Sequence, residues 1–121
     1  MHVTPFRSGT RDVVARFLSK DAKNIPDAHS GLNTVIRLLE LTPQVDLKIT
    51  GKLEAVRDGV LEFRYDLKDH WLRIFVAYWP TGMNVVILHI VLKKANRLDK
   101  DDVEIAIRNL KAHKRQTRGG N

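Results

Sequence analysis

The first third of the chain carries apolar side chains at the spacing of amphipathic helices. From Thr10 to Lys20 this spacing predicts a short helix, with apolar positions at Val13, Val14, Phe17 and Leu18. The polar segment KNIPDAHSG then interrupts the pattern and offers Asp27 or Ser30 as the N-cap of a second helix. That helix ends at Thr42-Pro43. Its apolar stripe consists of Leu32, Val35, Ile36 and Leu39.

After the second helix, apolar and polar residues alternate as they do in strands. Residues 47–56, LKITGKLEAV, predict a strand ending at Arg57-Asp58-Gly59, and Asp-Gly between apolar runs favours a hairpin. Within residues 60–67, apolar and polar residues alternate from Leu61 to Leu67, which is typical of a half-buried antiparallel strand. Residues 71–79 and 84–94 are apolar on both faces and predict two central strands.

A third amphipathic segment follows, in which Asp99 is the expected N-cap and acids fill the first turn. A short strand from His2 to Phe6 fits only at an edge or an end of a sheet, because Pro5 cannot donate a hydrogen bond. The predicted fold class is α+β: a small antiparallel sheet of three to five strands, two N-terminal helices packed on it, and a C-terminal helix. We expect helices on one face of the sheet and a partly open second face that serves as a binding surface.

Length and composition predict one domain over residues 1–121, with a basic flexible tail from about residue 114. The absence of cysteine excludes disulfides, zinc-thiolate sites and thiol nucleophiles. The longest apolar run, Val85 to Leu92, is too short to span a bilayer, and the N-terminus lacks the apolar core of a signal peptide. We therefore expect a cytoplasmic protein without a membrane partner.

The chain is basic, with a net charge of +7 and a pI near 10.0. Residues 1–60 hold nine Lys/Arg against seven Asp/Glu, whereas residues 61–121 hold twelve against seven. The excess charge therefore belongs to the second half. Such a balance favours an anionic partner, most often a nucleic acid or an acidic protein.

Two polar residues interrupt the apolar central strands. Arg73 needs a partner if it is buried, so it either forms a salt bridge with Glu62 or Asp66 or binds an anion. His89 shares a strand face with Val91 and Lys93, and is either a structural residue or part of a site.

Further cations gather at the strand end and in the last helix. Lys93 and Lys94 point to opposite faces of a strand, so only one can share the face of His89. The two lysines either prevent aggregation at the strand end or bind an anion. The basic tail is either a solvated helix end or a nucleic-acid contact. In the nucleic-acid interpretation, the RNA-binding residues are Lys52, Arg97, Lys111, Lys114 and Arg115.

Motifs for metal binding, phosphate loops and serine nucleophiles are absent, so we expect neither a metal nor a cofactor. Arginine, lysine and histidine are nevertheless sufficient to cleave RNA, because its 2′-OH is its own nucleophile. Such a site needs a base for that hydroxyl, a cation for the charged phosphorane and an acid for the leaving 5′ oxygen.

The stretch GVLEFRYDLKDHWLRIFVAY, followed by NVVILHIVLKKANRLDKDDVEIA, resembles the HigB branch of the RelE superfamily of type II toxins. The resemblance covers roughly residues 59–108. It rests on an ordered set of elements rather than one motif: Leu61-Glu62-Phe63-Arg64, the strand from Arg73 to Tyr78, and Leu88-His89 to Lys93-Lys94.

The resemblance implies a metal-free, ribosome-dependent mRNA endonuclease. It also implies a cognate antitoxin, of helix-turn-helix HigA-like type, that neutralises the toxin in a hetero-oligomeric complex. Arg64, Arg73 and Lys94 match positions that hold phosphate-stabilising cations in the superfamily. His89 and Lys93 match family-typical positions and are the candidates for proton transfer.

This sequence also departs from the pattern of these toxins. Glu62 stands where relatives carry a lysine, Leu98-Asp99 replaces a Thr-Pro, and a tyrosine of the last helix is absent. Glu62 then either acts as the base or marks a protein that has lost cleavage. Two alternatives therefore stay open: a ParE-like inhibitor of gyrase, and a non-toxic nucleic-acid-binding phage accessory domain that stacks bases on Trp71, Tyr78 or Trp79.

Overall fold

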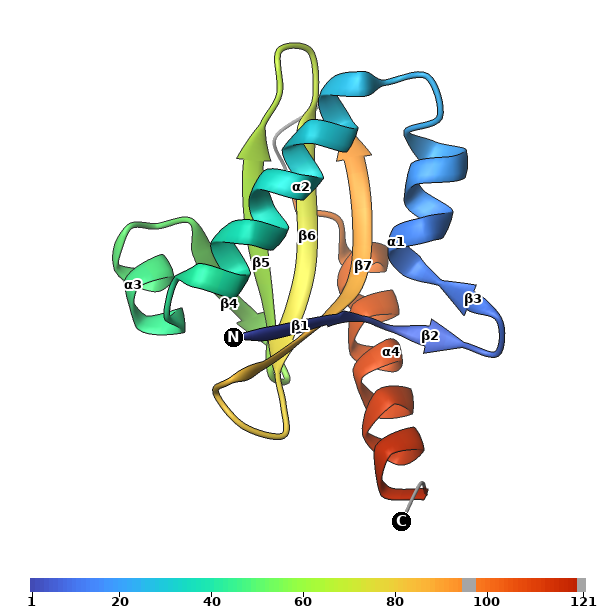
Figure 1. Ribbon diagram of the computed structural model, residues 1–121, viewed down its shortest axis with the longest axis vertical. Helices are drawn as coiled ribbons and strands as arrows, with labels where there is room; N and C mark the ends of the chain where they lie inside the picture. Colours follow the sequence, from blue (N-terminus) through green and yellow to red (C-terminus); the bar gives the residue numbers. More distant parts are fainter. Residues whose placement is uncertain (95–97, 120–121) are drawn as a thin grey trace.

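A computed structural model describes residues 1–94 and 98–119 of the chain (Figure 1). The N-terminal half contains short strands followed by helices: β1 His2–Pro5, β2 Arg7–Ser8, β3 Arg11–Asp12, α1 Val13–Arg16, a π-helical turn Phe17–Asp21, α2 Pro26–Leu41 and α3 Gln44–Ile49. The second half contains four strands and a long helix: β4 Leu53–Arg57, β5 Val60–Asp66, β6 Trp71–Tyr78, β7 Asn84–Lys93 and α4 Lys100–Gly119.

Five of the strands form one sheet in the order β1-β7-β6-β5-β4. Strands β4 to β7 are an antiparallel meander, as the alternating pattern predicts, and β1 adds to the edge of β7 in parallel. The predicted α+β class is confirmed. Pro5 lies at the end of the edge strand, where its missing N–H removes no hydrogen bond between central strands.

The turn between β4 and β5 is the predicted Asp-Gly hairpin. Asp58 has φ 53° and Gly59 has φ 84°, so both central residues adopt the left-handed conformation that a two-residue turn requires. Glycine accepts this conformation without steric cost, which explains its place in the sequence. Arg57, at the end of β4, forms an ion pair with Glu104 of α4 and so ties the hairpin to the last helix.

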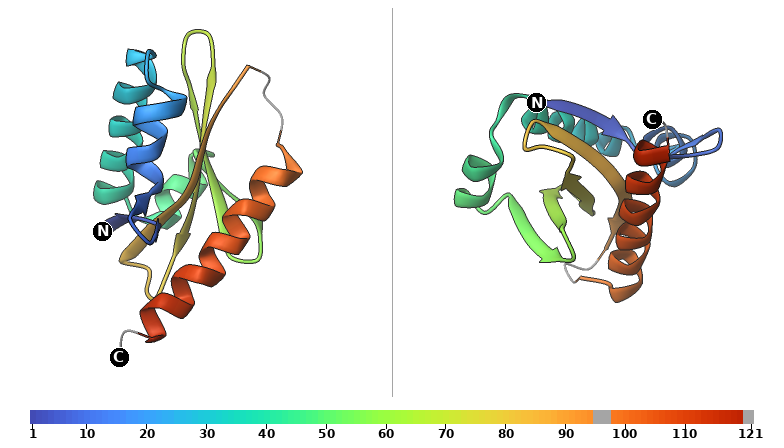
Figure 2. Two further views of the ribbon diagram at one scale, coloured as in Figure 1. Left: turned by 90° about the vertical axis from the view of Figure 1, so that its right-hand side faces the viewer. Right: turned by 90° about the horizontal axis from the view of Figure 1, so that it is seen from below.

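Helices cover both faces of the sheet, contrary to the expectation that they lie on one face. α2 and the π-helical turn pack on one face, around a core that includes Phe17, Leu32 and Ile74. α4 packs diagonally on the other face, over Phe75 and Leu88 (Figure 2). Because β6 alternates its side chains between two apolar layers, almost the whole strand is buried. The open surface is therefore smaller than expected.

The strand predicted over residues 47–56 forms only in its second half. Its first residues belong to the short helix α3, and β4 begins at Leu53. Gly51, with φ 78°, turns the chain between the helix and the strand. Leu47 is buried, whereas the apolar side chains of Val45 and Ile49 are 60% and 77% exposed.

The predicted N-cap of the last helix is confirmed, because the side chain of Asp99 accepts a hydrogen bond from the backbone N–H of Asp101 at 2.9 Å. Helix α4 then continues as far as Gly119, through the segment that the sequence suggested as a flexible tail from about residue 114. Gln116 is tied to the N-terminal strands, since its side-chain amide donates to the carbonyl of Arg7 at 3.0 Å.

Candidate functional site

Arg73 and Glu62 form a buried ion pair on the face of the sheet that α4 covers. Arg73 Nη1 donates to Glu62 Oε2 at 2.8 Å, and the two residues are 2% and 4% exposed. They meet because residue 62 on β5 and residue 73 on β6 point to the same face of adjacent antiparallel strands. Of the two alternatives for Arg73, a salt bridge or an anion site, the structure shows the salt bridge, with Glu62 as its partner. In this arrangement the arginine supports the sheet, and its charge is matched.

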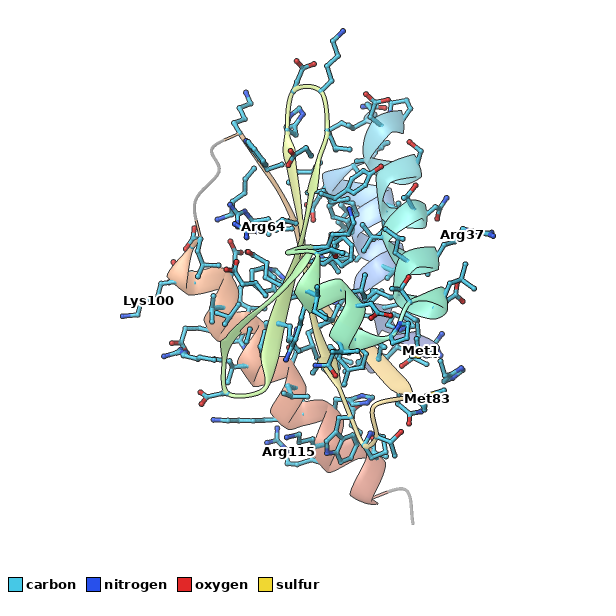
Figure 3. All side chains as sticks on the ribbon, turned by 90° about the vertical axis from the view of Figure 1, so that its left-hand side faces the viewer. Met1, Arg37, Arg64, Met83, Lys100 and Arg115 are labelled. Carbon is cyan, nitrogen blue, oxygen red and sulfur yellow. The ribbon has the colours of Figure 1, made fainter. Side chains whose placement is uncertain are left out.

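Arg64 lies at the rim of the same face (Figure 3). Its Nη2 is 2.6 Å from Glu54 Oε2, and its Nε is 3.7 Å from Glu62 Oε1. Arg64 is therefore more accessible than Arg73, but it also faces two carboxylates. Glu62 lies between the two arginines and so behaves as their shared counter-ion.

His89 is held against α4. Its Nε2 lies 2.9 Å from Asp102 Oδ1, and its ring stacks on Phe75 with the ring centroids 5.9 Å apart. A β-bulge places it there, because the register passes from Phe75–His89 to Val76–Ile87 and leaves Leu88 as an extra residue. Asn109 of α4 donates to the carbonyl of Leu88 at 2.8 Å, which fixes the bulge to the helix.

Lys93 completes this group at the end of β7. Its ammonium is 2.8 Å from Asp102 Oδ2 and 3.3 Å from Asp99 Oδ2. Asp102 therefore bridges the imidazole and the ammonium with its two oxygens. The sequence interpretation assigned both aspartates only to the start of the helix and missed this role. The sequence did contain a signal for this role. A helix that follows a strand after a short loop and packs back on it places its first turn beside the end of that strand.

Lys94 does not join this group. It is exposed and follows the last residue of β7, and no ion pair among the described residues links it to Arg73 or His89. The resemblance matches both Arg73 and Lys94 to phosphate-stabilising positions, but the structure gives no geometric support for a site that they share, because Arg73 is buried and Lys94 lies beyond the end of β7.

The cations of this face are matched by carboxylates. The ion pairs described here join three cations to four carboxylates: Arg64, Arg73 and Lys93 to Glu54, Glu62, Asp99 and Asp102. This cluster is therefore not the free cationic surface that the sequence suggested. We call it the paired cluster below.

An unpaired group of cations lies beside it. A cleft of about 470 Å³ opens next to His89, between the α1 segment and α4. Its rim carries side chains that sequence analysis did not single out: Arg11, Arg16, Lys20 and Arg108. None of the four takes part in a salt bridge within the described ranges.

The residues expected to bind RNA are spread over the molecule. Lys52 comes just before β4, where its carbonyl accepts from the N–H of Arg64 at 3.4 Å. Lys111, Lys114 and Arg115 lie toward the far end of α4, about 20 Å from Asp102 at most, given a rise of about 1.5 Å per residue. Arg97 lies outside the described residues. Figure 3 shows Arg64 and Arg115 well apart along the molecule.

The aromatic residues considered for base stacking do not form one platform. Trp71 and Tyr78 lie at opposite ends of β6, and their odd separation points them to opposite faces. Burial raises the pKa of the Tyr78 hydroxyl. Trp79 contacts His113 edge-on, with the ring centroids 5.8 Å apart, and burial lowers the pKa of that histidine.

Within the described part of the chain, no group of three or more His, Asp or Glu side chains is placed to hold a metal ion. In the same ranges, no helix is both long and apolar enough to cross a membrane.

The sequence of the chain was compared with models of known protein families, and one family matches. Residues 20–111 match the family described as phage derived protein Gp49-like (DUF891), which covers more than half of the chain. The chain belongs to the Gp49-like family. This family is of the RelE/HigB-like toxin type, so the resemblance noted in the sequence is supported at that level. No curated protein matches the chain.

Proposed function

We propose that this Gp49-like protein is the toxin of a toxin–antitoxin pair and cleaves RNA without a metal ion, with His89 as the proton-transfer group. One observation carries the proposal: His89 is hydrogen-bonded to Asp102 and lines a cleft that also carries four cations. A histidine oriented by a carboxylate beside a cationic surface is suited to general acid–base chemistry on a phosphodiester.

In this proposal each ring nitrogen of His89 has a separate role. When Nε2–H donates to Asp102, the neutral imidazole carries its lone pair on Nδ1. Nδ1 takes the proton of the 2′-OH as the 2′ oxygen attacks phosphorus, and the bond from phosphorus to the 5′ oxygen breaks. The products are a 2′,3′-cyclic phosphate and a 5′-hydroxyl end, the leaving oxygen being protonated. Asp102 stabilises the imidazolium that forms, as an oriented carboxylate does in other acid–base sites.

Lys93 supplies a cation in the same network, because it shares Asp102 with His89. Its ammonium can stabilise the phosphorane or protonate the leaving oxygen. Arg73 then has a supporting role, since it is buried against Glu62. This assignment favours His89 and Lys93 over Arg73 and Lys94, which are the weaker candidates on burial and position.

The proposal includes the partners that this toxin type implies. They are the ribosome with its mRNA, and a helix-turn-helix antitoxin that forms a hetero-oligomer with the toxin in the cytoplasm. The basic charge of the chain supports the RNA partner.

A second candidate function is a toxin that inhibits a host enzyme such as gyrase without cleaving RNA. The paired cluster favours it, because each of the three cations in that cluster already faces a carboxylate. A surface of this kind can recognise a protein partner without stabilising a phosphorane.

The test is induced expression of the wild type, His89→Gln and Lys94→Ala, with growth followed and mRNA 5′ ends mapped. Glutamine can still donate a hydrogen bond to Asp102 but cannot take up a proton. We expect growth arrest with new mRNA ends for the wild type and for the Lys94→Ala control, and neither for His89→Gln. Arrest by all three proteins without new ends would reject cleavage and favour the inhibitor.

A further inference from the structure

The cleft beside His89 lies along a part of β7 that no strand covers within the described part of the chain. β1 pairs with β7 only from Asn84 to Ile87, so the edge of β7 is open beyond that point. The α1 segment lies on one side of this edge and α4 on the other (Figure 2). The two helical segments form the walls of the cleft, and Ile90 and His89 lie between them.

Both walls contribute cations. Arg16 and Lys20 are four residues apart in a helical segment, so they share a face, and Arg11 precedes them in β3. Arg108 projects from α4 on the opposite wall. Three of the four are arginines, whose planar guanidinium groups can bind a phosphate through two parallel hydrogen bonds.

The carboxylates of the cleft do not cancel this charge. Asp12 accepts hydrogen bonds from the N–H groups of Val14 at 2.8 Å and Ala15 at 3.0 Å, and it also faces Arg7 at 3.5 Å. It is therefore occupied as the N-cap of α1. Asp21 is the other acidic residue of the lining, against four cations on the rim. Unlike the paired cluster, the cleft has a net positive charge.

We propose that this cleft binds the phosphodiester backbone of single-stranded RNA and leads it past His89. The inference rests on the proposed RNA-directed function and adds to it the surface that holds the substrate. Cations on two facing walls can contact successive phosphates of one strand, and the histidine lies at the side of that path.

The alternative occupant of the cleft is an acidic polypeptide. The positions of the exposed apolar side chains argue against such a partner. Protein interfaces are anchored by exposed apolar and aromatic side chains. In the described ranges, the large apolar side chains that are exposed lie outside the cleft: Leu41, Val45, Ile49, Met83 and Leu98. The aromatic residues of the lining, Phe6 and Phe17, are buried in the two cores.

The experiment measures the affinity of the purified protein for a fluorescent 2′-O-methyl oligonucleotide of about ten nucleotides, a length within the usual range for a single-strand site. This probe keeps the phosphates and cannot be cleaved. The variants are Arg16→Gln, Arg108→Gln and the double variant. The matched control is Arg37→Gln, because Arg37 is an exposed arginine that points outward from α2 (Figure 3).

We expect each cleft variant to weaken binding about threefold and the double variant about tenfold, because each loses a phosphate contact. The slope of log affinity against log salt should fall in magnitude by about 0.7 per lost contact. Arg37→Gln should bind like the wild type. Circular dichroism melting curves test whether every variant is folded.

Two results would overturn the inference. In the first, the folded cleft variants bind the oligonucleotide as the wild type does. In the second, a polyglutamate peptide of equal charge displaces the oligonucleotide at the same concentration as unlabelled oligonucleotide, which would assign the cleft to acidic polypeptides.

Cleavage of an mRNA in a translation reaction is followed separately. If the wild type binds RNA through the cleft but does not cleave, the nuclease proposal fails and the cleft assignment stands. If it cleaves and the cleft variants bind and cleave normally, the cleft assignment fails and the nuclease proposal stands.

Discussion

Replacing Glu62 by glutamine tests the assignment of Arg73 to the support of the sheet. The change keeps the size of the side chain and a hydrogen-bonding oxygen, but it removes the negative charge 2.8 Å from the guanidinium. Both residues are almost fully buried, so solvent does little to compensate for the lost charge. Breaking one side of a buried ion pair typically costs about 3–5 kcal/mol.

We therefore expect Glu62→Gln to lower the free energy of unfolding by about 3 kcal/mol or more, a large share of the total stability of about 5–15 kcal/mol usual for small domains. Urea unfolding monitored by tryptophan fluorescence measures this change in the free energy of unfolding. The double variant Glu62→Leu with Arg73→Met should recover most of the loss, because an apolar pair of similar volume often replaces a buried ion pair without cost.

The control is Glu54→Gln, which breaks the ion pair with Arg64 at the rim. Those side chains are 63% and 38% exposed, so the expected loss is at most about 1 kcal/mol. The reasoning is refuted if Glu62→Gln costs no more than Glu54→Gln, or if the double variant is less stable than Glu62→Gln alone. Either result would mean that the buried pair does not determine the stability of this face.

Three further predictions concern the turn, the bulge and the response to acid. Gly59→Ala should lower stability by about 1 kcal/mol because φ is 84°, whereas Gly82→Ala should not, as thermal melting can show. Asn109→Leu should cost about 1–3 kcal/mol in urea unfolding by removing the donor to the Leu88 carbonyl. Burial lowers the pKa of His113 below 6.5, so the folded state binds this proton less tightly than the unfolded chain. Stability should fall as the pH drops below that value, and His113→Gln should reduce the loss of melting temperature between about pH 8 and about pH 5.

The sheet and its buried ion pair could be predicted because they follow from alternation. Once β5 and β6 are taken as adjacent antiparallel strands, Glu62 and Arg73 fall on the same face. The Asp-Gly turn and the N-cap Asp99 are equally local signals. These features depend on neighbours in the sequence or on the next strand.

Helix α3 shows where alternation fails. Val45, Leu47 and Ile49 are separated by single polar residues, a pattern typical of a strand. The structure makes this segment a helix that buries Leu47, because the sheet already ends at β4 and, among the residues that the structure describes, no strand lies beyond it. Tertiary context outweighs local pattern in so short a segment.

The surroundings of His89 depend on a β-bulge that the sequence pattern does not predict. Counting in twos from Ile87 would place His89 on the face of α2. The extra residue at Leu88 turns it to the face of α4, where it meets Asp102. The cleft cations were missed for a related reason, since Arg16 and Arg108 are brought together only by the packing of α1 and α4 around β7.

The parallel edge strand has a consequence for how a newly synthesised chain acquires its structure. β1 is synthesised well before its partner on β7, which begins only at Asn84. At usual bacterial and eukaryotic synthesis rates, about 4–16 s separate the two segments. Helix α4, which shields the second apolar layer, follows later still. Folding is therefore completed only when the last third of the chain has been made, and a nascent chain lacking it exposes two apolar surfaces.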